Sequence, residues 1–167
     1  ILNLSPDHID RHKTLGKYIK AKFKLIKNQS INHVSFVKKN DPLIHKEIKS
    51  NKFKSKIIRI NTKKFKNYLR GIKNNYLLSE ANRENLLFVI AISKKLNLSI
   101  NKIKKVINKF KGLKYRQQII YKKSNLTIIN DSKSTSFSSS IGILKSNPNI
   151  YWLLGGMYKK GDKFDLS

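Results

Sequence analysis

The chain has 167 residues, with 37 lysines and arginines against 9 aspartates and glutamates, and its formal net charge at pH 7 is +28. It contains no cysteine, which excludes disulfide bonds, thiolate metal sites and a thiol nucleophile. No apolar run approaches the roughly 20 residues of a membrane-spanning helix, so we expect no insertion into a membrane. Hydrophobic residues make up 39% of the sequence, enough to form a core in one domain or in parts of two.

The positive charge alone would favour a nucleic-acid-binding protein. Few of the basic residues are arginines, however, although arginine is the side chain best suited to paired hydrogen bonds with bases and phosphates. The lysines are spread among isoleucines and asparagines, and the codons of all three are rich in A and T, so the base composition of the genome accounts for the excess. We therefore expect no nucleic-acid partner, and a basic nucleic-acid-binding fragment is the alternative. The arginines are Arg11, Arg59, Arg70, Arg83 and Arg116.

Short apolar runs and one helical pattern make up the first part of the chain. Residues 1–4, 33–37 and 57–60 predict buried strands, and we expect the basic segments between them at the surface. Thr14 is a candidate N-cap for a helix that reaches about Lys27.

Two further helices are predicted at residues 82–96 and 100–110. Ser99 is a candidate N-cap for the second, whose apolar residues recur at spacings of three and four. Gly112 follows it, as expected of a glycine that ends a helix. Because the pattern changes here, we place a domain boundary after Lys111.

The remaining residues predict a smaller α/β unit. Residues 117–121 and 126–130 predict a β-hairpin, and a loop rich in serine and threonine, residues 132–136, leads into a helix at about 138–145. Residues 150–154 predict another strand. Strand, loop, helix and strand in this order are typical of nucleotide-binding domains, and the predicted fold class is α/β.

Five separated segments resemble motifs of the Mur ligases. Residues 3–11 are similar to the DHxDR segment of this family, residues 82–85 to HNxxN and residues 112–116 to GLxHR. Residues 130–135 (NDSKST) are similar to the NDSKAT signature of the member that adds D-glutamate, and residues 153–162 fit its continuation. Since the segments occur in the family's order and spacing over nearly the whole chain, the sequence is identified as a member of the Mur ligase family.

The resemblance implies that residues 1–111 are the later half of a P-loop-type central ATPase domain. Residues 112–167 would be the start of a Rossmann-like C-terminal domain. The GxxxxGK[ST] phosphate-binding motif does not occur in the sequence. We therefore expect the chain to be an internal piece of a longer enzyme and to be inactive alone.

The activity implied by the resemblance is ATP-dependent amide-bond formation in peptidoglycan synthesis. The substrates would be UDP-N-acetylmuramoyl-L-alanine and D-glutamate, with Mg²⁺ as cofactor and an acyl phosphate as intermediate. The enzyme would be a cytoplasmic monomer. Another Mur-type ligase or a folylpolyglutamate-type ligase is the alternative within this class, and residues 130–135 argue against it.

The resemblance also assigns catalytic and metal-binding roles. His8 and Lys22 would hold magnesium, Lys22 as a carbamate, and Lys133 would face the γ-phosphate and the acyl phosphate. Lys22 matches the lysine of the family's YxxxK segment, here Tyr18 to Lys22. The predicted helix also places Lys22 on one face with Tyr18 and Ile26, so we expect it to point inward. The alternative is a lysine that reaches the surface along its aliphatic stem.

The remaining assignments concern the substrates. By the resemblance, Asn82 and Arg116 would contact the adenine nucleotide, and Asp131 its ribose. Thr135 and Lys159 would position D-glutamate. Ordinary structural roles are the alternatives: Asn82 would cap its helix, Asp131 would form a turn, and Arg116 would be a solvated charge at a strand edge.

Overall fold

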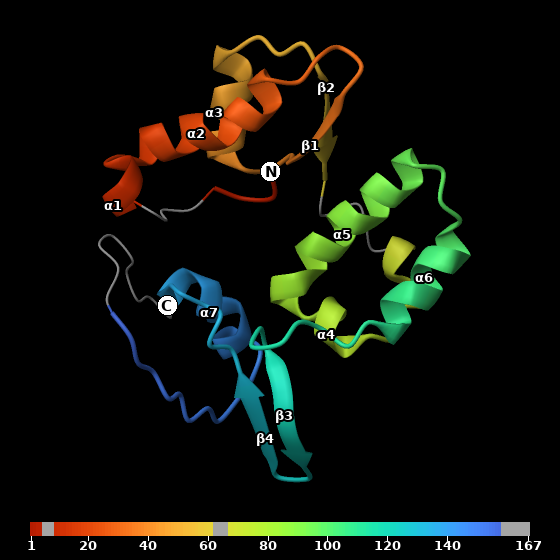
Figure 1. Ribbon diagram of the computed structural model, residues 1–167. Helices are drawn as coiled ribbons and strands as arrows, with labels where there is room; N and C mark the ends of the chain where they lie inside the picture. The colour runs from red at the N-terminus through yellow and green to blue at the C-terminus, as the bar shows by residue number, and fades with distance from the viewer. Residues whose placement is uncertain (5–8, 62–66, 158–167) are drawn as a thin grey trace. The chain divides into compact units, whose positions relative to one another are not determined.

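The computed structural model describes residues 1–4, 9–61 and 67–157 of the chain (Figure 1). Both helices and strands occur along it, with a parallel pair of strands, so the predicted α/β class is confirmed. The chain divides into two units, which are described in turn.

A parallel sheet underlies the first unit, which comprises residues 1–70 and 84–100. β1 (Val34–Lys38) and β2 (Lys56–Ile60) pair in parallel, from Val34 opposite Lys56 to Lys38 opposite Ile60. Both strands lie within one residue of their predicted positions. Alternate residues of β1 are buried, as expected for a strand with one face against a core.

Residues 1–4 lie along the other edge of β1. The nitrogen of Ile1 donates to the carbonyl oxygen of Phe36 over 2.7 Å, and the Ile1 carbonyl accepts from the amide of Lys38 over 3.1 Å. These two bonds form the pattern of a parallel pair. Residues 1–4 are not assigned as a strand in the structure, because Ile1 is the one residue among them with these bonds.

Helices cover this sheet and complete the core (Figure 1). The short α1 (Ile9–His12) precedes α2 (Leu15–Lys27), and α2 begins at Thr14, as predicted, because the Thr14 side chain accepts from the amide of Lys17 over 3.2 Å. The face of α2 that looks inward is apolar. The core consists of Leu4, Tyr18, Ile19, Phe23, Ile26, Val37 and Ile44.

Between β1 and β2, where the sequence predicted a basic surface segment and no helix was identified, lies α3 (Pro42–Ser50), of which Ile44 is buried. Asp41 begins it: Oδ1 accepts from the amides of Leu43 and Ile44, both over 3.0 Å. An N-cap aspartate followed by proline is a strong helix start, because proline lacks an N–H that the first turn would leave unpaired. The other carboxylate oxygen, Oδ2, accepts from the amide of Leu4 over 3.4 Å, so Asp41 also holds residues 1–4.

The long helix α5 (Glu80–Lys95) was predicted within two residues at each end. It carries the buried side chains of Leu86, Leu87, Phe88 and Ile90. Glu84 forms an ion pair with Lys38, with the Lys38 ammonium 2.7 Å from Oε1 and 2.9 Å from Oε2. This pair ties α5 to β1 within the first unit.

Three helices and a hairpin make up the second unit, which comprises residues 71–83 and 101–167. β3 (Gln118–Lys123) and β4 (Leu126–Asn130) pair antiparallel, as predicted. The helices are α4 (Asn75–Leu78), which the sequence did not predict, α6 (Ile100–Lys109) and α7 (Phe137–Lys145).

Asparagine side chains fasten the segment before α4 to the end of α6. Asn74 donates through Nδ2 to the carbonyl oxygens of Ile107 and Phe110, over 2.8 and 2.7 Å. Asn108, on α6, accepts through Oδ1 from the backbone amide of Lys73 over 2.8 Å. The last carbonyl groups of a helix lack donors within the helix, and the side-chain amide of Asn74 supplies donors for two carbonyl groups at the end of α6.

The strand predicted at residues 150–154 is not formed in the structure. Tyr151, Leu153 and Leu154 are exposed there, with Tyr151 99% exposed. A strand needs a neighbour for its backbone groups, and no ladder joins these residues to β3 or β4. The apolar run alone was therefore not sufficient to predict a strand.

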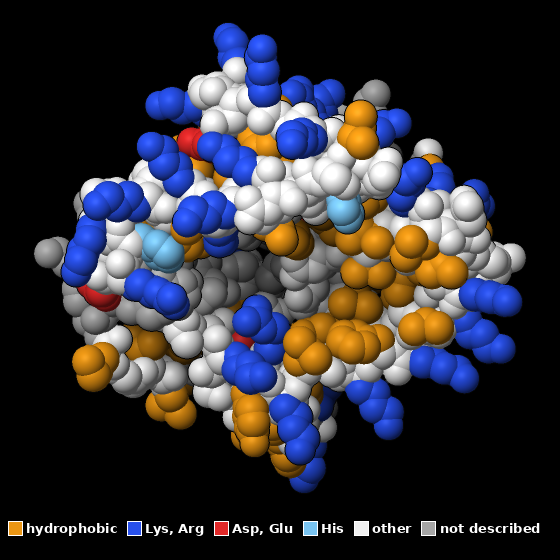
Figure 2. Space-filling model, turned by 45° about the horizontal axis from the view of Figure 1, so that its top comes forward, with side chains coloured by type: hydrophobic (Ala, Val, Ile, Leu, Met, Phe, Trp, Pro, Cys, Tyr) orange, Lys and Arg blue, Asp and Glu red, His pale blue; other side chains and the backbone are white. Residues whose placement is uncertain are grey.

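Basic side chains are spread over the face shown in Figure 2 and do not gather into one patch. Exposed apolar side chains lie among them. No helix in the described parts of the chain is long and apolar enough to span a membrane.

We expect the substitution Asp41→Ala to destabilise the chain by about 1–2 kcal/mol, because it removes the cap of α3 and leaves amide groups unpaired. Asp41→Asn keeps one carboxamide oxygen for the cap and should cost less, since asparagine caps helices about as well as aspartate. Urea unfolding followed by circular dichroism measures both. Asp10→Ala, at an exposed aspartate of α1, is the matched control. Wild-type stability in Asp41→Ala would contradict the role given to this carboxylate.

Candidate functional site

The loop after β4, residues 130–135, is held in shape by Asp131. The carboxylate accepts through Oδ1 from the amide of Gln117 over 3.0 Å and through Oδ2 from the hydroxyl of Ser134 over 2.8 Å. The backbone adds two bonds of 2.9 Å, from Ser134 N to the Asp131 carbonyl and from Lys133 N to the Tyr115 carbonyl. The loop is thus fastened to the segment that precedes β3.

This preceding segment, residues 112–117, turns through three left-handed residues. Gly112, Tyr115 and Gln117 have φ angles of 85°, 63° and 47°. A side chain at Gly112 would meet the ring of Tyr76, because an added Cβ would lie 3.3 Å from ring carbons. Glycine is therefore favoured there by conformation, and a Cβ would also require the Tyr76 ring to shift slightly. Tyr115 and Gln117 carry side chains in a conformation that such residues rarely adopt.

Asn82, the predicted adenine contact, is 6% exposed in the first turn of α5. Its Nδ2 lies within hydrogen-bond distance of the Tyr76 carbonyl at 3.0 Å, the Ser79 hydroxyl at 3.3 Å and Oε1 of Gln117 at 3.1 Å. The side chain thus joins α4, α5 and the 112–117 segment. The nucleotide role of Asn82 stays a prediction.

Three other predicted site residues of this unit, Arg116, Lys133 and Thr135, are exposed. Lys133 and Thr135 are exposed on the 130–135 loop, and Arg116 is exposed between the left-handed residues Tyr115 and Gln117. Asp131 is half-buried, and both of its oxygens accept hydrogen bonds. Asn82, Asp131 and Lys133 are therefore linked through contacts within one unit, by way of Gln117 and Tyr115.

Lys22 lies in the first unit, at the border of the buried face of α2. It is half-buried, so the predicted inward direction holds only in part. Its Nζ lies 4.7 Å from the centre of the Tyr18 ring, a distance at which a cation is attracted to the ring. Burial lowers the pKa of the Ile1 amino group, and the positive charge of Lys22 lowers it further. The other predicted residues, His8 and Lys159, lie outside the described residues.

No group of three or more histidine, aspartate or glutamate side chains lies together in the parts of the chain that the structure describes. Lys22 as an ammonium ion repels a metal ion, and only a carbamate would give it oxygen ligands. As they stand, the described residues do not complete a magnesium site. The site predicted at His8 and Lys22 stays a prediction.

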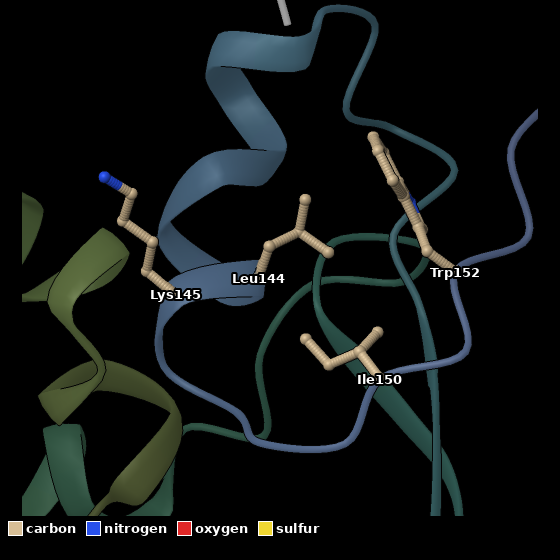
Figure 3. A pocket seen from close by; sticks show the side chains of 4 residues that line it. All are labelled: Leu144, Lys145, Ile150 and Trp152. Atoms are coloured by element: carbon tan, nitrogen blue, oxygen red, sulfur yellow. The ribbon is translucent and has the colours of Figure 1, made fainter. Parts of the chain in front are cut away.

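A hollow of about 310 Å³ lies between the end of α7 and residues 150–152 (Figure 3). Leu144, Ile150 and Trp152 face one another across it, whereas the ammonium group of Lys145 points away. Its lining is mostly apolar and includes none of the predicted site residues. The candidate functional site is therefore the fastened loop at residues 130–135, with the segments that hold it.

A family comparison agrees with the motifs on which the resemblance rests. Residues 1–108 match the model of the Mur ligase middle domain. The chain belongs to the Mur ligase family. The resemblance drawn from the five motifs is thereby confirmed.

Similar proteins of known name are Mur ligases too. The chain is 37% identical over 165 residues to the UDP-N-acetylmuramoylalanine–D-glutamate ligase of Francisella tularensis subsp. novicida (strain U112). It is 36% identical over 167 residues to the ligase of the same name from Francisella tularensis subsp. mediasiatica (strain FSC147). Each comparison covers 97% of this chain and 38% of the relative. The chain therefore spans less than half the length of these Mur ligases.

One residue of the site, Gln117, is not predicted by the sequence. Gln117 connects Asn82 to Asp131, and no motif marked it, because a contact between residues 35 positions apart depends on the tertiary fold. Asn85 lies in the HNxxN segment, and its side chain is exposed whereas that of Asn82 is buried. The helical spacing of three residues would have placed the two asparagines on one side of α5, without deciding which was buried.

We expect Asp131→Ala to free the loop from the 112–117 segment, because two donors lose their acceptor. The amides of Lys133 and Ser134 should then exchange their hydrogens about ten-fold faster or more, as measured by NMR-detected hydrogen exchange. The matched control is Asp10→Ala, whose loop amides should exchange at the wild-type rate. Unchanged exchange in Asp131→Ala would mean that other contacts hold the loop.

Proposed function

We propose that the chain is part of an ATP-dependent ligase that joins D-glutamate to UDP-N-acetylmuramoyl-L-alanine in peptidoglycan synthesis. The observation that carries this proposal is the similarity, over 97% of the chain, to ligases of that name. Residues 130–135 support the choice of amino acid, because their sequence is similar to the signature of the D-glutamate-adding member. The enzyme would act as a monomer in the cytoplasm.

The proposed domains follow the family pattern. Residues 1–111 would belong to a P-loop-type central ATPase domain, which the match over residues 1–108 supports. Residues 112–167 would begin a Rossmann-like C-terminal domain, which is supported by the order β3, β4, loop and α7. The boundary at residue 111 is a feature of the sequence and differs from the division into two units by contacts.

Lys133 is well placed, among the described residues of the second unit, for contact with a phosphoryl group. Its backbone is fixed through Tyr115 while its side chain is exposed. The loop leads directly into α7, whose N-cap is Ser136. Anions are stabilised at a helix N-terminus, because its first N–H groups point outward unpaired. A lysine at this position would neutralise charge that develops as the acyl phosphate forms and reacts.

The remaining site residues would bind and orient the substrates. Asn82 and Arg116 would serve the adenine nucleotide, and Asp131 its ribose in addition to its contacts within the loop. Thr135, two residues beyond Lys133, would contact D-glutamate together with Lys159. Magnesium, when bound, would neutralise phosphate charge.

In the full-length enzyme, Lys133→Ala should lower kcat about a hundred-fold or more, because a charge-stabilising group is lost from the transition state. Phosphate release that requires both UDP-N-acetylmuramoyl-L-alanine and D-glutamate measures the activity. Lys122→Ala, at an exposed lysine of β3 outside residues 112–117 and 130–135, is the matched control. A wild-type enzyme that uses a different amino acid in place of D-glutamate would overturn the proposed substrate. Normal turnover in Lys133→Ala would remove this lysine from the site.

A second experiment tests the carbamate on Lys22. The full-length enzyme in ¹³C-bicarbonate should show the carbonyl resonance of a carbamate, because Lys22 matches the carbamylated lysine that the Mur ligase resemblance implies. The resonance should disappear in Lys22→Ala and persist in Lys20→Ala, a control at an exposed lysine of the same helix. A spectrum without this resonance, or one that Lys22→Ala leaves unchanged, would contradict the assignment.

A further inference from the structure

Gln117 stands between two residues to which the Mur ligase resemblance gives nucleotide roles. Its side-chain oxygen Oε1 accepts from Nδ2 of Asn82 over 3.1 Å. Its backbone amide donates to Oδ1 of Asp131 over 3.0 Å. One residue thus contacts both the first turn of α5 and the loop that carries Lys133.

The backbone of Gln117 is held in an unfavourable conformation. Its φ angle of 47° lies in the left-handed region, where a side chain crowds the following carbonyl group. Such a conformation persists when surrounding contacts hold it, and it is frequent at functional sites. Here the surrounding contacts are the bonds to Asn82 and Asp131.

The partner at the α5 end is firmly placed. Asn82 is 6% exposed, and its Nδ2 also reaches the Tyr76 carbonyl and the Ser79 hydroxyl. At the loop end, Tyr115 adds a parallel connection, because its carbonyl accepts from the amide of Lys133 over 2.9 Å. A shift of residues 115–117 relative to α5 would therefore carry Lys133 with it.

We propose that Gln117 is a positioning residue. Its side-chain carboxamide fixes the 130–135 loop against the first turn of α5, and so sets where Lys133 lies relative to the bound nucleotide. The proposal rests on the proposed ligase function. Gln117 itself would touch no substrate. A misplacement of about 1 Å can cost about a hundred-fold in rate, so the loss of this contact should lower kcat.

The test compares Gln117→Ala with Gln117→Gly in the full-length enzyme. Glycine adopts the left-handed conformation freely and keeps the amide that donates to Asp131, so Gln117→Gly removes only the side-chain contact. Both variants should lower kcat about ten-fold or more and leave the KM for ATP within about three-fold of wild type. Normal kcat in Gln117→Gly would overturn the proposal, because the backbone conformation alone would then be sufficient. A rise in KM for ATP with kcat unchanged would overturn it too.

A double-mutant cycle with Asn82 completes the test. If Asn82 and Gln117 act through their mutual contact, kcat of the double variant Asn82→Ala/Gln117→Ala should be no lower than kcat of the less active single variant. Effects on kcat that multiply would overturn the proposal. The same cycle can be measured without activity, from the free energy of unfolding of the 167-residue chain in urea. If the two substitutions lower that free energy additively, the contact is absent. A wild-type enzyme inactive with D-glutamate would instead count against the proposed function, which separates the two failures.

Discussion

The carboxylate of Asp131 is the interaction on which the candidate site depends. It satisfies a backbone amide at Gln117 and a hydroxyl at Ser134, and so joins the segment before β3 to the loop after β4. A carboxylate bound to such donors gives up contact with water and is stabilised by directional bonds in return. Because the loop is fastened at Asp131, Lys133 and Thr135 project from a defined backbone and need not be ordered by a substrate first.

Hydrogen bonds from polar side chains to backbone groups also join segments elsewhere in the chain. Asp41 caps α3 and also accepts from the amide of Leu4, and Asn74 supplies donors to the end of α6. In a sequence with 9 acidic residues against 37 basic ones, carboxylates are scarce. Asp41 and Asp131 bind backbone groups, and Lys38 and Glu84 form an ion pair. At the junctions made by Asp41 and Asp131, local stability thus depends on bonds from side chains to the backbone.

The high positive charge and the family membership fit together without a nucleic-acid partner. Lysine and arginine side chains are spread over the face shown in Figure 2. A high net charge favours solubility and does not by itself create a binding site. The lysine that matters for the proposed chemistry is distinguished by its place, on a fastened loop beside a helix N-terminus, and not by its charge. Composition alone therefore did not identify the family, whereas short motifs in the right order did.

Local features could be predicted from the sequence. The Thr14 cap, the apolar spacing of α6 and the hairpin of β3 and β4 were confirmed, because each depends on residues that are neighbours in the chain. The family was also identified from the sequence, since each of its motifs is a short run of neighbouring residues. The sequence carried a signal for α3 as well, in Asp41 followed by Pro42, which was overlooked.

Features that depend on distant residues were decided by the tertiary structure. Residues 150–154 are apolar enough for a strand, yet a strand forms only where another backbone supplies its hydrogen bonds. Lys22 shares the apolar face of α2 but lies half-buried beside Tyr18, because its depth is set by what packs around the helix. The contact of Asn82 with Gln117 joins residues 35 positions apart, and no local pattern encodes such a meeting. Periodicity fixes which side of a helix a residue occupies, whereas its partners are fixed only when other segments fold against that side.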